Sequence, residues 1–125
     1  MIKSFKDLIV WQKAMDLVVE VYQLSGNFPQ TEIYSLMNQL RRAAVSIVSN
    51  IAEGKGRESR SEYFHFLSIA QGSLSETETQ LLLATRLGYI TEEKVKQSLL
   101  LIDEIGKMLH TIRKKLKDSC QVPNT

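Results

Sequence analysis

The sequence predicts an all-α protein with one domain, an antiparallel, up-down-up-down, left-handed four-helix bundle. Four segments carry apolar residues at alternating spacings of three and four, which is the helical period. Glycine, proline and short polar links separate these segments, and no segment alternates as a β-strand does. A chain of 125 residues is long enough for one sizeable core. We expect residues 1–118 to form the bundle and residues 119–125 to form a flexible C-terminal tail.

Composition and charge favour a cytoplasmic protein. No apolar run approaches the roughly 18 residues of a membrane span, and the N-terminus lacks a secretory cleavage pattern. The chain has one cysteine, Cys120, which cannot form an internal disulfide. Proteins that lack disulfides are typical of the reducing cytoplasm.

The first helix is expected from about Asp7 to Ser25 and carries two apolar stripes. One stripe consists of Leu8, Trp11, Met15, Val18 and Tyr22. The other consists of Val10, Ala14, Leu17, Val21 and Leu24. A two-residue offset is about 200° around a helix, so the stripes lie nearly opposite. A bundle helix needs one apolar stripe, and the second stripe therefore predicts contact with another subunit.

The second helix is expected from about Leu36 to Glu53. Gly26 and Pro29 end the first helix before it, and Ser35 is placed to cap its start with a side-chain oxygen. Gly54 is placed to end it in a left-handed conformation, which glycine adopts without strain.

The third helix is expected from about Arg60 to Arg86. Ser59 and Glu62 have the spacing of a capping box at its start. Gly88 stops it, and the link to the second helix is short, as between antiparallel neighbours.

The fourth helix begins after Thr91, whose hydroxyl can cap it. Its core stripe runs from Val95 to Leu116 at helical spacing. Lysines near its end suit the negative C-terminal pole of the helix dipole.

Positive charge is concentrated in two stretches. Residues 36–60 hold five basic and two acidic side chains, and residues 91–125 hold seven basic and five acidic ones. Such clusters can meet phosphates, although many are only solvated faces, and stacking aromatics are not interleaved with them. The candidate nucleic-acid-binding residues are Arg41, Arg42, Lys55, Arg57, Arg60, Arg113, Lys114, Lys115 and Lys117.

A structural role competes for the adjacent arginines. Arg41 and Arg42 point about 100° apart, and charges inside a bundle need partners. We expect Glu76 and Glu78 of the third helix to pair with at least one of them. The predicted interhelical polar network comprises Arg41, Arg42, Ser46, Asn50, Glu53, Ser73, Glu76 and Glu78.

Catalytic, metal and cofactor sites are not predicted. Arg60 and His65 have the spacing of the active motif of HEPN-domain ribonucleases, which act on RNA without a metal. This spacing is frequent by chance, so the ribonuclease is kept as an alternative. His65 and His110 are the two histidines, and neither has a second ligand at a useful helical spacing. No serine, cysteine or lysine has an evident activating base.

The chain resembles the four-helix-bundle proteins encoded by intervening sequences of bacterial large-subunit ribosomal RNA genes, the S23-type family. The resemblance spans about Phe5 to Lys115. It rests on the segments Asp7–Ala14, Phe28-Pro29, Gln39–Ala44, Asn50–Gly54, Gly72–Leu74 and Leu87–Tyr89.

A related group is similar to the accessory variability proteins of diversity-generating retroelements. This resemblance implies a homopentameric ring, RNA or DNA as a ligand, and a reverse transcriptase or another protein as a partner. The sequence thus predicts a non-enzymatic, oligomeric protein that binds nucleic acid or scaffolds a nucleoprotein complex. A purely structural protein-interaction ring is the second alternative.

Overall fold

The computed structural model of the chain describes residues 4–120, and side chains for residues 4–118. Four α-helices account for most of this part: α1 (Ile9–Ser25), α2 (Leu36–Lys55), α3 (Arg60–Arg86) and α4 (Glu92–Cys120). Two short 3-10 helices, η1 (Phe5–Asp7) and η2 (Gln30–Glu32), precede α1 and α2. The described residues include no β-strand, which confirms the predicted all-α, four-helix class.

The observed helix ends agree closely with the predicted ones. The bounds of α3 are those expected, whereas α1 starts two residues later and α2 continues two residues further than predicted. Helix α4 continues through Cys120, so it includes two residues of the expected tail. The remaining tail residues, 121–125, lie outside the described residues.

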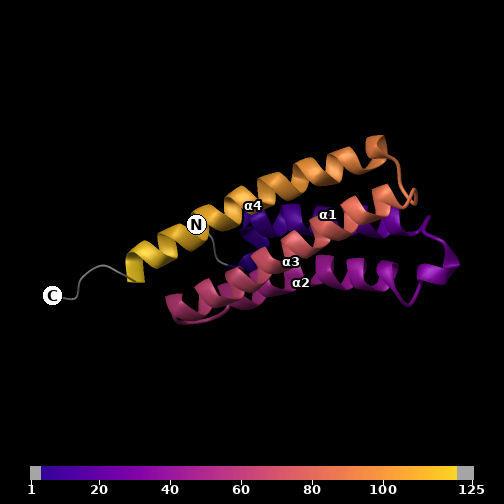
Figure 1. The fold of residues 1–125 in the computed structure, drawn as a ribbon. Coiled ribbons are helices and arrows are strands. Elements are labelled where there is room, and N and C mark those ends of the chain that lie inside the picture. Colours follow the sequence, from indigo (N-terminus) through magenta and orange to yellow (C-terminus); the bar gives the residue numbers. More distant parts are fainter. Residues whose placement is uncertain (1–3, 121–125) are drawn as a thin grey trace.

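The helices pack around one core. Each helix contacts the next in sequence, and α1 also contacts α4, so the four close around a common axis (Figure 1). Along α2, residues with higher numbers contact residues of α3 with lower numbers. Gln39 contacts Gln80, and Ser46 contacts Ser73. The largest fully buried apolar side chains come from all four helices: Leu17, Leu40, Ile47, Ile51, Leu67, Leu81, Ile105 and Leu109.

The two apolar stripes of α1 have different environments. Val10, Ala14, Leu17 and Val21 are buried and form the core face. On the other stripe, Met15 and Tyr22 are 41% and 42% exposed. The prediction that the Val10–Leu24 stripe faces another subunit is therefore wrong, because that stripe packs on α2 and α4. Leu8 of the other stripe is buried, and Trp11 and Val18 pack against the core, so the exposed apolar side chains of α1 are Ile9, Met15, Val19 and Tyr22.

The start of α2 is capped by a different residue from the one predicted. Ser35 occupies the N-cap position, but its side chain makes no capping hydrogen bond. The backbone N–H of Leu36 instead donates to Glu32 Oε1 at 3.2 Å. The hydroxyl of Tyr89 donates to Glu32 Oε2 at 2.6 Å, which ties the loop before α2 to the loop after α3. Glu32 can serve both groups because its longer side chain spans the turn of η2.

Two glycines at helix ends have different roles. Gly88 adopts a φ of 80°, and Tyr89 N–H donates to the carbonyl of Ala84 at 2.9 Å, as in a Schellman C-cap. Gly54 is still helical, so its predicted left-handed role is wrong. A Cβ at Gly54 would lie 2.9 Å from Phe66 Cβ, closer than real side chains come. The glycine at 54 therefore permits close packing of α2 on α3.

The starts of α3 and α4 are capped as predicted. Ser59 Oγ accepts from the backbone N–H of Glu62 at 3.0 Å, and Thr91 Oγ1 accepts from that of Lys94 at 3.1 Å. Each oxygen satisfies a backbone donor that has no partner within its helix.

Candidate nucleic-acid interface

The fold brings the C-terminal parts of the two basic stretches, residues 55–60 and 113–117, to one end of the bundle. Arg113 Nε, on α4, donates to Ser68 Oγ of α3 at 3.3 Å. This contact places the last turns of α4 beside the start of α3, where the α2–α3 link also lies (Figure 1). We call this region the basic end. It comprises Lys55, Arg57, Arg60, Arg113, Lys114, Lys115 and Lys117.

Part of the charge at the basic end is already balanced. Arg57 Nη2 lies 2.7 Å from Glu53 Oε2, and Arg57 Nη1 lies 3.8 Å from Glu62 Oε2. Both bridges are about half exposed, so each contributes only about 0–1 kcal/mol to stability. Because Arg57 has two carboxylate neighbours, it is the weakest candidate here for contact with a phosphate. The predicted network residue Glu53 is committed to this bridge.

Three aromatic rings at the start of α3 carry cations over their faces. Lys55 Nζ lies 5.8 Å from the ring centroid of Tyr63. The guanidinium carbon of Arg57 lies 4.8 Å from the centroid of Phe66. The guanidinium carbon of Arg113 lies 5.2 Å from the ring centroid of Phe64. Such contacts are worth about 0.5–1 kcal/mol where exposed, and burial raises the pKa of Tyr63.

Sequence reasoning missed these rings because it looked for aromatics interleaved with basic residues in the chain. The run Tyr63-Phe64-His65-Phe66 directly follows the Lys55–Arg60 cluster, and that adjacency was the available signal.

Four cations of the basic end are exposed and make no ion pair within the described residues. They lie on two neighbouring helices, one at the start of α3 and three in the last turns of α4. They are Arg60, Lys114, Lys115 and Lys117. These side chains can reach a phosphate without breaking an existing bridge.

The adjacent arginines of α2 are not part of the basic end. Arg41 precedes Lys55 by fourteen residues on one helix, which is about 21 Å at 1.5 Å per residue. Its Nε donates to Ser25 Oγ at 2.8 Å, its Nη2 donates to the Tyr22 carbonyl at 3.2 Å, and it stacks on the Tyr22 ring. Arg42 is exposed.

The expected pairing of these arginines with Glu76 and Glu78 is absent from the described residues. Arg41 points toward α1 rather than α3, and both glutamates are exposed. That expectation is therefore wrong. Water solvates the two carboxylates, so they need no buried partner.

Three residues of the predicted polar network do meet between α2 and α3. The hydroxyls of Ser46 and Ser73 lie 2.8 Å apart. Asn50 Nδ2 donates to the carbonyl and the hydroxyl of Ser46 at 2.8 and 3.0 Å. These small polar groups satisfy one another across a close helix pair.

Arg60 and His65 do not converge on one site. Both are exposed on α3, and a spacing of five residues places them about 140° apart around the helix. The His65 ring meets Phe66 edge-on, with centroids 5.6 Å apart.

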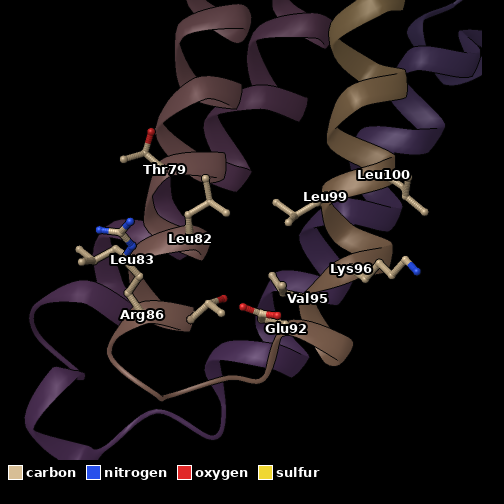
Figure 2. Close-up of a pocket in the computed structure, with 10 residues that line it drawn as sticks. Thr79, Leu82, Leu83, Arg86, Glu92, Val95, Lys96, Leu99 and Leu100 are labelled. Carbon is tan, nitrogen blue, oxygen red and sulfur yellow. The ribbon is translucent and has the colours of Figure 1, made fainter.

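A second surface of functional interest is an apolar groove between α3 and α4 near the loop between them. Leu82, Leu83 and Leu100 are 47%, 45% and 59% exposed. Figure 2 shows Leu99 projecting from α4 toward Leu82 of α3. We call this surface the leucine groove.

Within residues 4–120, the part of the chain that the structure describes, neither a metal site nor a membrane span is present. The described residues hold no group of three His, Cys, Asp or Glu side chains placed to bind a metal ion. No helix in that part of the chain is long and apolar enough to cross a membrane.

The fold and the basic end define a helical-bundle protein with a cationic surface. The chain belongs to the 23S rRNA-intervening sequence protein family, whose family model matches residues 6–111. It is similar to a protein of unknown function from the S23 ribosomal protein family of Bacteroides thetaiotaomicron. The two share 30% sequence identity with a TM-score of 0.79, over 85% of this chain and 99% of that one. A comparison with curated proteins found no match.

Proposed function

We propose that this chain binds nucleic acid through the basic end and does so without a catalytic step. The observation that carries the proposal is the contact of Arg113 with Ser68 and Phe64. This contact joins two basic stretches that are far apart in sequence into one surface. Clustered cations bind phosphate backbones chiefly by releasing counterions, so four unpaired cations at one end support such binding.

RNA is the first ligand to test, because the family is named for an intervening sequence of 23S rRNA. The test compares two variants that each lose four exposed positive charges. One replaces Arg60, Lys114, Lys115 and Lys117 with Gln. The control replaces Arg42, Arg86, Lys94 and Lys96, which lie away from the basic end. Fluorescence anisotropy with labelled RNA measures affinity from 50 to 200 mM salt.

We expect the first variant to lose at least tenfold in affinity and the control to lose less than threefold. The slope of log K against log salt should also become shallower by up to about 3–4 in the first variant, because slope scales with the number of phosphate contacts. Equal losses in both variants would show nonspecific attraction to the whole molecule. Absence of binding at 50 mM salt would refute the proposal and leave a structural ring as the better function.

We also propose that copies of the chain, folded as up-down-up-down left-handed bundles, assemble into a homopentameric ring. Two exposed apolar surfaces support self-association: the exposed side chains Ile9, Met15 and Val19 of α1, and the leucine groove. Contact between two different surfaces of identical chains is head-to-tail, and such contacts close into a ring when the rotation between copies closes, and otherwise form open filaments. A ring would present several basic ends together, which raises affinity by avidity.

Mass measurement in solution tests the assembly. Leu83→Glu in the leucine groove is expected to yield monomers, whereas Ile69→Glu, at an exposed position of α3 outside the groove, should leave the mass unchanged. A monomeric wild-type chain would refute the ring.

A further inference from the structure

We infer that the basic end binds double-helical nucleic acid by its paired phosphate backbones and does not hold single strands by stacking their bases. This inference rests on the proposed nucleic-acid binding and specifies the ligand of the same surface. It follows from what covers the aromatic rings and from where the unpaired cations lie.

Tyr63 and Phe66 are partly buried, and a cation lies over one face of each ring. Lys55 lies over the Tyr63 ring and Arg57 over the Phe66 ring. Both side chains also approach α2 closely, because a Cβ at Gly54 would lie 3.0 Å from Tyr63 Cδ1 and 2.9 Å from Phe66 Cβ. A base could stack on the covered face of either ring only by displacing its cation.

Phe64 is covered by a cation that is itself held in place. The hydrogen bond from Arg113 Nε to Ser68 Oγ fixes the guanidinium over the Phe64 ring. Stacking on aromatic side chains contributes about 1–3 kcal/mol per base to single-strand binding. A base could gain this contribution at Phe64 only by displacing Arg113, whose contacts would then be lost.

The unpaired cations suit a dense array of phosphates. Arg60 lies on α3, and Lys114, Lys115 and Lys117 lie on α4, two helices packed side by side. Lysine ammonium groups are compact point charges that pair with phosphate oxygens without a fixed geometry. A duplex carries one charge per about 1.7 Å of its axis, a higher density than a single strand, so charge contacts alone favour the duplex.

His65 is the ring at this end that is exposed and carries no cation over its face within the described residues. The planes of the His65 and Phe66 rings meet at 69°, and the exposed His65 ring is the one at this end that a single-stranded base reaches without displacing a cation. This makes His65 the residue whose replacement distinguishes stacking from charge contacts.

The experiment titrates the full chain against labelled 20-nucleotide probes of one mixed sequence. The probes are single-stranded RNA, single-stranded DNA, duplex RNA and duplex DNA, at 50 and 200 mM salt. We expect at least one duplex to bind at least fivefold tighter than its own single strand, and comparison of the two duplexes identifies which nucleic acid is preferred. His65→Ala should change affinity for every probe by less than twofold. Arg113→Gln should lower the ratio of duplex to single-strand affinity, because it removes a cation and uncovers Phe64.

A ratio below fivefold for both nucleic acids would overturn the inference while leaving the proposed function intact. A selective loss of single-strand binding in His65→Ala would overturn it as well, because stacking would then contribute. Absence of binding to all four probes at 50 mM salt would refute the proposed function itself, and the inference with it.

Discussion

The two ends of the bundle use charged side chains in different ways. We call the end where α1 joins α2 and α3 joins α4 the loop end. There Arg41 and Glu32 hold parts of the protein together through Ser25, Tyr22 and Tyr89. At the basic end, four exposed cations have no ion-pair partner within the described residues. An arginine near a buried hydroxyl thus has a structural role, and one near a helix end on the surface is free to bind a ligand.

The ends also differ in what keeps their helices in place. At the loop end, hydrogen bonds and the Phe28–Tyr89 ring contact, 5.4 Å between centroids, join two loops. At the basic end, the close approach of α2 and α3 at Gly54 keeps these two helices in place. Substitution of Gly54 at the basic end should therefore act through packing, and substitution of Arg41 or Tyr89 at the loop end through polar contacts.

The largest effect on stability is expected from Gly54→Ala. The new Cβ would overlap Phe66 Cβ and Tyr63, and overpacking costs about 1–3 kcal/mol. The gain in helix propensity of about 1 kcal/mol offsets only part of this cost. Gly72→Ala is the matched control, because nothing lies within 4 Å of its new Cβ. It should be stabilising by about 0.5–1 kcal/mol. Urea unfolding measures the free energy of unfolding of both variants. If both substitutions changed it in the same direction, the packing role of Gly54 would be contradicted.

Arg41→Ala should have the next largest effect. It removes two hydrogen bonds to α1 and the contact with the Tyr22 ring, a loss of about 1–2 kcal/mol. Its neighbour supplies the control, since Arg42 is exposed and Arg42→Ala should change stability by less than about 0.5 kcal/mol. If the two variants unfold at the same urea concentration, the structural role assigned to Arg41 is wrong.

A smaller difference in stability is expected between alanine substitutions of the two N-cap serines, one at each end of the bundle. Ser59→Ala removes the acceptor for Glu62 N–H at the start of α3 and should cost about 1 kcal/mol. Ser35→Ala, at the N-cap of α2, should cost less, because that side chain caps no backbone group and adds only a hydrogen bond to the Glu32 carboxylate. Thermal unfolding of the two variants provides the comparison. A larger loss for Ser35→Ala would reverse the assignment of Glu32 as the cap.

The smallest predicted effect is a change in the pH dependence of stability. The hydrogen bonds from Tyr89 and from Leu36 N–H lower the pKa of Glu32 below its ordinary value of 4.5, and the bond to Glu32 raises the pKa of Tyr89. Because the carboxylate form is favoured in the folded state, its contribution is complete above about pH 4.5 and is lost as the pH falls through the lowered pKa.

Tyr89→Phe should therefore lower the melting temperature at pH 7, and the difference from wild type should shrink below pH 4.5. Tyr34→Phe is the control, because the Tyr34 side chain is 94% exposed. If the difference in melting temperature between Tyr89→Phe and wild type stays constant down to pH 3, the Tyr89 hydroxyl does not act through the ionised Glu32.

The helices were predictable from sequence because their signals are local. Apolar periodicity defined the core stripes, and Ser59, Thr91 and Gly88 marked helix ends correctly. The packing role of Gly54 and the bond of Glu32 to Tyr89 were not predictable, because they depend on residues of other elements, 9 to 57 positions away. The same limit explains the misassigned stripe of α1 and the missed partner of Arg41.

The candidate site was predictable as a set of residues but not as a surface. Charge counting found both basic stretches, and only the packing of α4 on α3 shows that they share one end. The cations over Tyr63, Phe64 and Phe66 were missed, because ring contacts between helices leave no periodic signal in a single segment.

The short link between α2 and α3 has a consequence for the order of folding. Closing a loop as short as residues 56–59 costs little entropy, so this helical hairpin should form early in the folding transition state. Gly54→Ala and Ser59→Ala should then mainly slow folding, whereas Arg41→Ala, which loosens α1, should mainly speed unfolding. The α2–α3 part of the surface that we assign to nucleic acid would thus be ordered before α4 adds its three lysines.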